Sequence, residues 1–237
     1  MSRLRVVGPG RAGTAFAAAL GNAGWEAKRP LGRDDDLATA AEGVDLLLLA
    51  TPDAAVADVS ALVDPVAETV VVHVAGSLGV DVLARHPRRG AVHPLMTLPA
   101  GGRGAANLSS GGWFAVAGDP LTAVVVADLG GQSFRVADDE RPLYHAAACV
   151  AANHLVALMG QVERLAELAH VPFEAYLALA GGALADVAAL GPAAALTGPA
   201  ARGDDTTIAA HLAALPASER RAYEVMSRLA RSLAAQQ

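Results

Sequence analysis

The chain has 237 residues and a formal net charge of −6, with 53% hydrophobic and 18% charged side chains. This composition suffices for a substantial core and excludes an intrinsically disordered chain. The excess of acidic side chains offers no basic surface for nucleic acid or anionic lipid. A single cysteine, Cys149, excludes an internal disulfide and a thiolate-rich metal site, so no metal is expected. No apolar run reaches the roughly 18 residues of a membrane span, and we expect a soluble, cytoplasmic protein without nucleic-acid or membrane partners.

Short apolar runs alternate with small-residue helices in the first half of the chain. The run 44–50 is continuously apolar, which is typical of a strand buried on both faces of a parallel sheet. The alternation predicts an α/β fold, with a doubly wound Rossmann domain over residues 1–137. We expect strands over 4–8, 25–29, 44–50, 69–74, 91–93, 113–117 and 133–136, and helices over 11–23, 34–42, 54–62 and 120–129.

The second half is expected to be entirely helical, as a substrate and dimerisation domain over residues 138–237. Three acidic residues at 138–140 suit the N-terminus of a helix of about 30 residues. Two or three further helices follow, separated at Gly191–Pro192 and by the segment 197–205. The long alanine-rich helix is too apolar to be covered by those helices alone, so we expect a homodimer.

A G-x-G-x-x-G motif follows the first predicted strand and opens the first helix. Gly8 permits the tight turn, Gly10 lets the backbone approach a pyrophosphate, and Gly13 lets helix and strand pack closely. The helix N-terminus at Arg11 and Ala12 offers unpaired N–H groups to the phosphates. The motif in this context predicts a bound dinucleotide cofactor.

The residues after the second strand discriminate between the two nicotinamide cofactors. NAD enzymes usually place an acidic residue there to hold the ribose 2′-hydroxyl. Here the stretch is basic, and arginine suits the 2′-phosphate of NADP, with Arg33 the first candidate and Arg29 the second. We therefore predict NADP, while Asp34 lies close enough to keep NAD possible.

Polar residues follow three of the buried strands, at the edge where open α/β sheets bind ligands. Thr51 and Pro52 follow the strand 44–50 and are expected to face the nicotinamide ribose. Thr51 or Asp53 serves equally well as the cap of the next helix. Ser77 and His93 follow the next two strands, and we predict that they bind substrate.

Two polar groups stand out in the helical half. His145 lies one turn from Cys149 in the long helix and is the candidate proton donor, while Asn153 would orient the reacting carbonyl. A structural helix–helix hydrogen bond is the alternative for Asn153. Arg202 and Thr206, in a later glycine-bearing loop, are predicted to bind a substrate carboxylate, the alternative being a helix-capping turn.

Several motifs together resemble one family: the G-x-G-x-x-G start, "HVAGS", "HPLMT", "YHAAACVAANHLVAL" and "TGPAARGDDTTIAAHL". They resemble an uncharacterised bacterial family of Rossmann-like proteins with a C-terminal helical domain of unknown function, in the 6-phosphogluconate dehydrogenase-like superfamily. The resemblance covers nearly the whole chain and implies an NAD(P)-dependent oxidoreductase with a helical dimerisation domain. It extends to pyrroline-5-carboxylate reductases, whose substrate-carboxylate loop is similar to Gly203–Thr207. Ketopantoate reductases instead use a lysine of the helical domain, and the only lysine here is Lys28.

These observations predict an NADPH-linked reductase of a small oxo or imino acid. Because an iminium needs no proton delivered to the carbon that receives the hydride, a site without lysine fits imine reduction slightly better. The alternative is a non-catalytic dinucleotide-binding sensor or regulatory protein. The polar residues of the helical half gather in two motifs instead of being scattered, which favours an enzyme.

Overall fold

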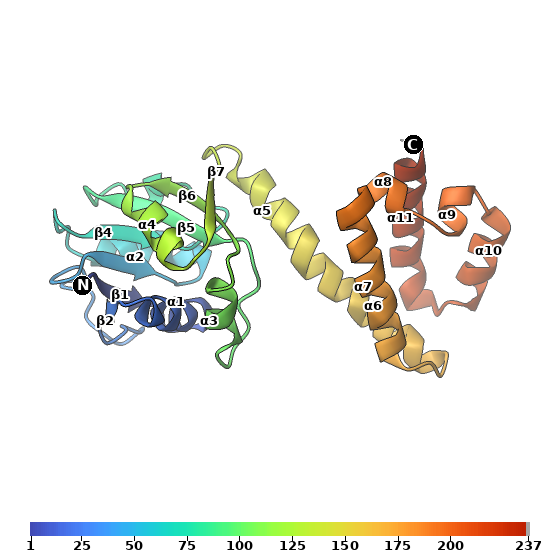
Figure 1. Cartoon of the computed structure of the whole chain (residues 1–237), viewed down its shortest axis with the longest axis horizontal. Helices are drawn as coiled ribbons and strands as arrows, with labels where there is room; N and C mark the ends of the chain where they lie inside the picture. Colours follow the sequence, from blue (N-terminus) through green and yellow to red (C-terminus); the bar gives the residue numbers. More distant parts are fainter. Residues whose placement is uncertain (236–237) are drawn as a thin grey trace. The chain divides into compact units, whose positions relative to one another are not determined.

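The computed structural model describes residues 1–235 and divides the chain into two compact units. The first unit is Met1–His154, and the second begins at Leu155 (Figure 1). The domain boundary predicted after residue 137 marks the start of the helical region and lies inside the first unit. That boundary stays a prediction.

The first unit is built on one seven-stranded sheet with the strand order β2-β1-β3-β4-β5-β6-β7. All neighbouring strands pair in parallel except β5 and β6, which are antiparallel. The predicted doubly wound α/β sheet is confirmed, and the order reverses at β1, directly before the glycine-rich turn. The strands are β1 (Arg3–Val7), β2 (Glu26–Ala27), β3 (Leu46–Leu49), β4 (Val70–His73), β5 (Arg89–Pro94), β6 (Trp113–Gly118) and β7 (Gln132–Arg135).

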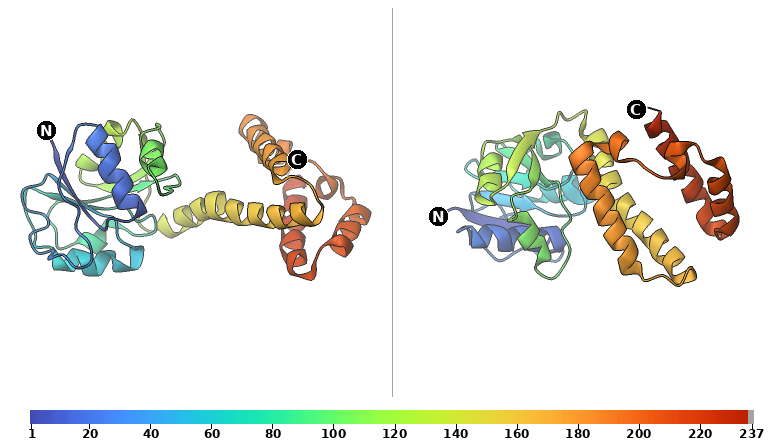
Figure 2. Two further views of the ribbon diagram at one scale, coloured as in Figure 1. Left: turned by 90° about the horizontal axis from the view of Figure 1, so that it is seen from below. Right: turned by 45° about the vertical axis from the view of Figure 1, so that its right-hand side comes forward.

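Helices cover both faces of this sheet. Leu46 and Leu48 of β3 pack in one core cluster with residues of α1, whereas Leu47 and Leu49 pack in a second cluster with residues of α2. Figure 2 shows α1 and α2 on opposite faces of the sheet. The elements of this unit are α1 (Arg11–Asn22), η1 (Asp53–Ala55), α2 (Val56–Leu62), η2 (Val80–Leu83), α3 (Arg103–Leu108), α4 (Leu121–Asp128), α5 (Arg141–Cys149) and the π-helical turn η3 (Val150–His154).

The helix predicted over 34–42 is wrong, because that segment forms turns. Its aspartates bind nearby backbone instead of starting a helix: Asp35 accepts from the Gly32 N–H at 2.6 Å, and Asp36 from the Ala38 N–H at 3.0 Å. The guanidinium of Arg5 also donates to the carbonyls of Thr39 and Ala40, which a helix would have used internally. Local side-chain bonds and one long-range arginine thus outcompete helix formation.

The predicted long helix is present as 28 helical residues, Arg141–Leu168, but it is not uniformly α-helical. The π-helical turn η3 separates α5 from α6 (Leu155–Leu168). A π turn inserts an extra residue into the helix and is frequent at functional sites. Asn153 lies in this turn.

The second unit consists of helices in the part of the chain that the structure describes. Gly191, with φ of +82°, ends α7, and Pro192 begins the next helix, as the sequence predicts. Glu219 joins α6 to α11, because its carboxylate accepts two hydrogen bonds from Arg164. The helices after α6 are α7 (Phe173–Leu190), α8 (Pro192–Ala195), α9 (Pro199–Arg202), α10 (Asp205–Ala214) and α11 (Ala217–Ala234).

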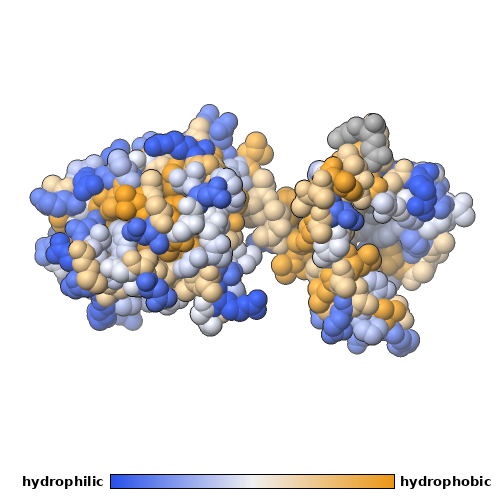
Figure 3. Space-filling view, viewed as in Figure 1, coloured by the Kyte–Doolittle hydropathy of each residue, from blue (hydrophilic) through white to orange (hydrophobic). Residues whose placement is uncertain are grey.

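Two helical segments are long and apolar enough, by length and composition, to cross a membrane. They are Arg141–Leu168 and Phe173–Leu190, with mean hydropathies of 1.3 and 1.4. The expectation that no segment meets this criterion is therefore wrong. Their apolar side chains are largely uncovered within the chain: Leu179 is 68% exposed and Leu190 61%. Figure 3 shows apolar side chains gathered over α7.

The hydroxyl of Thr69 is expected to stabilise the irregular segment before β3, and a substitution of this residue tests its contribution. Its buried hydroxyl lies 2.7 Å from the carbonyl oxygens of both Ala41 and Val44. Thr69→Val should lower the free energy of unfolding of the first unit by about 1–3 kcal/mol, because two buried carbonyls lose their donor. Urea unfolding followed by tryptophan fluorescence measures this, since both tryptophans, Trp25 and Trp113, belong to that unit. Thr69→Ser keeps the hydroxyl and is the control; equal losses for the two variants would contradict the assignment.

Candidate functional site

The glycine-rich turn has the shape that a dinucleotide requires. Gly8 has φ of +92°, and a Cβ there would lie 2.8 Å from the Ala50 carbonyl oxygen. A Cβ on Gly13 would lie 2.1 Å from the Gly8 carbonyl oxygen, so only glycine lets α1 begin this close to β1. By contrast, no described atom lies within 4 Å of a Cβ on Gly10. The open side of the turn at Gly10 and the start of α1 therefore fit a pyrophosphate.

The basic segment after β2 lies beside this turn, because the Gly8 N–H donates to the Leu31 carbonyl at 2.9 Å. Arg29 is held in an ion pair with Asp35, at 2.5 Å. The Gly32 N–H and then Arg29 lower the pKa of the Asp35 carboxyl. Arg33 is exposed and has no ion pair or hydrogen bond within residues 1–235, which leaves its guanidinium free for a 2′-phosphate.

The carboxyl ends of β3, β4 and β5 meet at one edge of the sheet. The Thr51 hydroxyl oxygen after β3 is buried without a hydrogen-bond partner among the described residues. Ser77, after β4, donates a hydrogen bond to the Asp53 carboxylate at 2.8 Å. Thr51 does not cap η1, which begins at Asp53 without a side-chain cap. The Thr51 hydroxyl thus lies at this edge of the sheet without a hydrogen-bond partner among the described residues.

Three aromatic side chains meet at the end of β5. The His93 Nδ1 lies 2.7 Å from the Tyr144 hydroxyl of α5, and the His93 and His145 rings are edge-to-face with centroids 5.6 Å apart. The His145 Nε2 lies 3.7 Å from the sulfur of Cys149. We call His93, Tyr144, His145 and Gly76 the histidine site. All four belong to the first unit.

Gly76 completes this site, and its lack of a side chain is essential to it. A Cβ at Gly76 would lie 2.5 Å from the His145 Nδ1 and 2.7 Å from the His93 Nε2. One imidazole nitrogen of each histidine is therefore directed at the same backbone atom. The loop after β4, which contains Gly76, therefore lies against side chains of both β5 and α5.

Burial keeps His93 of the site and the neighbouring His73 neutral. It lowers the pKa of His93 to about 4, with a further contribution from His145. It also lowers the pKa of the fully buried His73 to about 4, although the Gly79 carbonyl partly opposes this. Burial raises the pKa of Tyr144, so its hydroxyl remains protonated at neutral pH.

Arg141, the first residue of α5, is fully buried. Its Nε donates to Asp138 at 3.1 Å, and its other two nitrogens have no hydrogen-bond partner among the described residues. The positive charge contributes to lowering the pKa values of His73, His93 and Tyr144. Sequence reasoning identified neither Arg141 nor Tyr144 as a site residue. An arginine at the start of a helix is normally solvated, so the position of Arg141 in the sequence does not indicate its burial.

The remaining predicted residues lie elsewhere. Asn153 is exposed in the π turn and makes no side-chain hydrogen bond within the described chain, so the predicted alternative of a structural hydrogen bond lacks support there. In the second unit, Asp204 caps α10 by accepting from the Thr207 N–H at 3.0 Å and its hydroxyl at 2.7 Å. The loop is therefore a capping turn in part. Arg202 and Thr206 are exposed, and their substrate-binding role stays a prediction.

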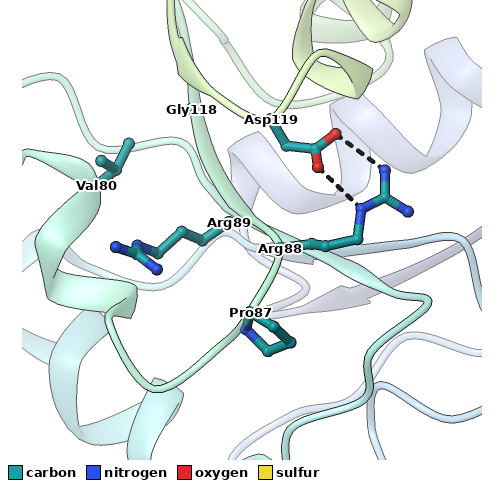
Figure 4. A pocket seen from close by; sticks show the side chains of 6 residues that line it. All are labelled: Val80, Pro87, Arg88, Arg89, Gly118 and Asp119. Atoms are coloured by element: carbon teal, nitrogen blue, oxygen red, sulfur yellow. Dashed lines mark hydrogen bonds and ion pairs between the residues drawn. The ribbon is translucent and has the colours of Figure 1, made fainter.

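A separate pocket of about 250 Å³ lies at the opposite end of β5 from His93 (Figure 4). Arg88 closes one side of it through two hydrogen bonds to Asp119, at 2.9 and 3.1 Å. This pocket lies outside the ligand-binding edge of the sheet. It is lined by Val80, Pro87, Arg88, Arg89, Gly118 and Asp119.

Comparison with known proteins gives one family match and several similar folds. The domain of unknown function DUF2520 matches residues 115–230. No curated protein matches the chain. A Bacteroides fragilis protein described as a candidate NADP oxidoreductase is 22% identical over 98% of each chain, with a TM-score of 0.81.

Two better-described enzymes have similar structures. A reductive aminase from Aspergillus terreus, in complex with NADPH and ethyl levulinate, is 18% identical over 98% of this chain and 92% of its own, with a TM-score of 0.67. The NADP-bound pyrroline carboxylate reductase of Plasmodium falciparum is 13% identical over 99% and 100%, with a TM-score of 0.61. Residues 115–230 therefore match a domain of unknown function, DUF2520, and the chain has the Rossmann-like fold of these oxidoreductase structures.

Proposed function

We propose that this protein is an NADP-dependent oxidoreductase that reduces a small oxo or imino acid. One observation carries the proposal: His93 and His145 converge on Gly76 at the same edge of the sheet as the glycine-rich turn. A dinucleotide sensor, the alternative, needs the turn but has no use for two imidazoles that converge beside it. Buried titratable groups with shifted pKa values cluster at catalytic sites, which favours the enzyme.

The cofactor assignment rests on the fit of the turn. Gly8, Gly10 and Gly13, with the first N–H groups of α1 at Arg11 and Ala12, would hold the pyrophosphate. Arg33 would hold the 2′-phosphate, and Thr51 and Pro52 would face the nicotinamide ribose. The NADP and NADPH in the similar reductase and aminase structures support this choice over NAD.

The chain's own residues would position and protonate the substrate. NADPH, when bound, supplies the hydride that the substrate carbon gains. His93 or His145 would donate the proton, and Ser77 would bind the substrate beside them. Asn153, Arg202 and Thr206 are proposed to orient the reacting group and hold the substrate carboxylate. With a single lysine, Lys28, in the strand-end segment after β2, a lysine donor from the helical half is excluded.

We further propose a homodimer in which α7 and the segment Arg141–Leu168 pack against a second copy. Every residue of α7 remains at least partly exposed within the chain, although its composition is that of a buried helix. Uncovered apolar helices of this length need a partner in water. A second copy suits a soluble oxidoreductase fold better than a membrane does.

Removing Arg33 should affect only the cofactor that carries the 2′-phosphate. Arg33→Ala should weaken NADPH binding by about 10- to 150-fold, the equivalent of about 1.5–3 kcal/mol for a charged hydrogen bond, and leave NADH binding unchanged. Fluorescence titration with both cofactors measures this. Arg29→Ala is the matched control and should have the smaller effect, because Asp35 already neutralises that side chain. Equal losses for the two cofactors would contradict the assignment.

The buried, neutral His73 and His93 should make stability depend on pH. His73 and His93 have pKa values of about 4 in the folded protein, against about 6.5 when unfolded. Between those values the unfolded chain binds more protons, so the free energy of unfolding must fall as the pH drops from about 7 towards 4. Each histidine contributes at most about 3 kcal/mol. Urea unfolding across this range tests it, and His93→Gln should flatten the dependence; an unchanged slope would count against a neutral His93.

Light scattering at micromolar concentration should give the mass of a dimer, with an interface well above ~1,000 Å². Leu179→Glu, at an exposed position of α7, should shift the protein to monomer, because a buried interface rejects an unpaired charge. A monomeric wild-type protein, or one that partitions into phospholipid vesicles, would overturn the dimer.

A further inference from the structure

The two histidines of the site differ in what their nitrogens can reach. The His145 Nδ1 is buried against Gly76 without a partner, and its Nε2 faces the Cys149 sulfur. The His93 Nδ1 is bound to Tyr144, but its Nε2 makes no hydrogen bond within the described chain and is not among the atoms sealed from water. Of the two nitrogens without a hydrogen-bond partner among the described residues, the His145 Nδ1 is sealed from water and the His93 Nε2 is not, so the His93 Nε2 is the one open to a substrate.

Tyr144 determines which form His93 takes. A phenol O–H is more acidic than the N–H of a neutral imidazole, so across the 2.7 Å contact Tyr144 donates and the His93 Nδ1 accepts. A neutral imidazole carries one proton, which must then be on Nε2. Phe134, edge-to-face with the Tyr144 ring at 5.8 Å, helps to hold that ring in place. The open nitrogen of His93 is consequently a hydrogen-bond donor.

We propose that His93 is the proton donor, that Tyr144 is its positioning residue, and that the substrate is an oxo acid, not an imino acid. This inference rests on the proposed function and deepens it. A carbonyl oxygen offers lone pairs to the Nε2–H, whereas an iminium nitrogen carries its own N–H and would face a donor. The direction of one hydrogen bond thus reverses the slight preference for an imine that the missing lysine indicated.

The proton transfers balance. The substrate carbon gains the hydride that NADPH supplies, and its oxygen takes the proton from the His93 Nε2. The His93 Nδ1 takes the Tyr144 hydroxyl proton in exchange; when the product leaves, Nε2 regains a proton from water and Nδ1 returns its proton to the Tyr144 oxygen. A ketone, NADPH and one proton thereby become an alcohol and NADP⁺. The positive charge of Arg141, which lowers the pKa of Tyr144 against the effect of burial, favours the transient negative charge on that oxygen.

The other charged groups around His93 fit this assignment. Asp53 is exposed and hydrogen-bonded to Ser77, and Asp138 is paired with Arg141. Among the described residues, neither carboxylate is hydrogen-bonded to His93, so neither competes with Tyr144 for its Nδ1. His73 is buried and neutral, and it cannot take the proton from His93 at neutral pH.

Tautomers provide a test that does not depend on turnover. Long-range ¹⁵N–¹H NMR spectra of the full-length protein should show His93 with its proton on Nε2 at pH 7. Tyr144→Phe should mix the two tautomers of His93. Tyr223→Phe is the matched control, because it removes a similar hydroxyl from His211 in the second unit, at 2.6 Å, and should leave His93 unchanged. A wild-type His93 protonated on Nδ1 would overturn the proposal.

Kinetics then separate this inference from the proposed function. With NADPH, the wild type should reduce short 2-oxo acids such as 2-oxopentanoate in preference to the cyclic imino acid 1-pyrroline-2-carboxylate. His93→Gln should lower kcat by about 10²–10⁴-fold and His145→Gln by less than about tenfold, with NADPH affinity unchanged in both. Imine reduction alone, or the opposite order of the two variants, would overturn the inference and leave the reductase standing. Absence of NADPH binding would instead overturn the proposed function, while the NMR result would still decide the donor.

Discussion

Burial of β3 on both faces is the constraint on which the rest of the first unit depends. The four leucines Leu46–Leu49 are all fully buried, and alternate leucines enter opposite cores. Such a strand is stable only inside a sheet covered by helices on both sides, which requires parallel neighbours joined by crossovers. The carboxyl ends of β1, β3, β4 and β5 then fall on one edge. The glycine-rich turn and the histidine site share that edge for this reason.

The chemistry of the site follows from the same burial. An imidazole on this edge loses water, so His73 and His93 are neutral at a pH where exposed histidines are partly charged. Arg141 brings a full positive charge into the same interior, with Asp138 as its single ion-pair partner among the described residues. A buried arginine with two unpaired nitrogens is costly. Arg141 is the first residue of α5, so the helix that carries Tyr144 and His145 begins at this buried positive charge.

The helices of the second unit are packed differently from the sheet unit. Polar contacts such as Glu219 with Arg164 join helices inside the second unit, but α7 keeps an apolar surface that the chain itself does not bury. The first unit has a closed core, whereas α7 of the second unit has no fully buried residue within the chain. The membrane-length apolarity of these helices and their expected role in a dimer have the same physical origin.

The sequence alone was sufficient to predict the features that depend on residues close together in the chain. The alternation of apolar runs predicts the doubly wound sheet, and the spacing of Gly8, Gly10 and Gly13 predicts the turn, because their roles depend on positions a few residues apart. The capping at Asp204 and the break at Gly191–Pro192 are equally local. The tertiary structure decided the rest. Tyr144 meets His93 across 51 positions of the chain, and Arg5 takes the carbonyls that a helix over 34–42 needed. No local pattern encodes such contacts, since they exist only once the strands have paired.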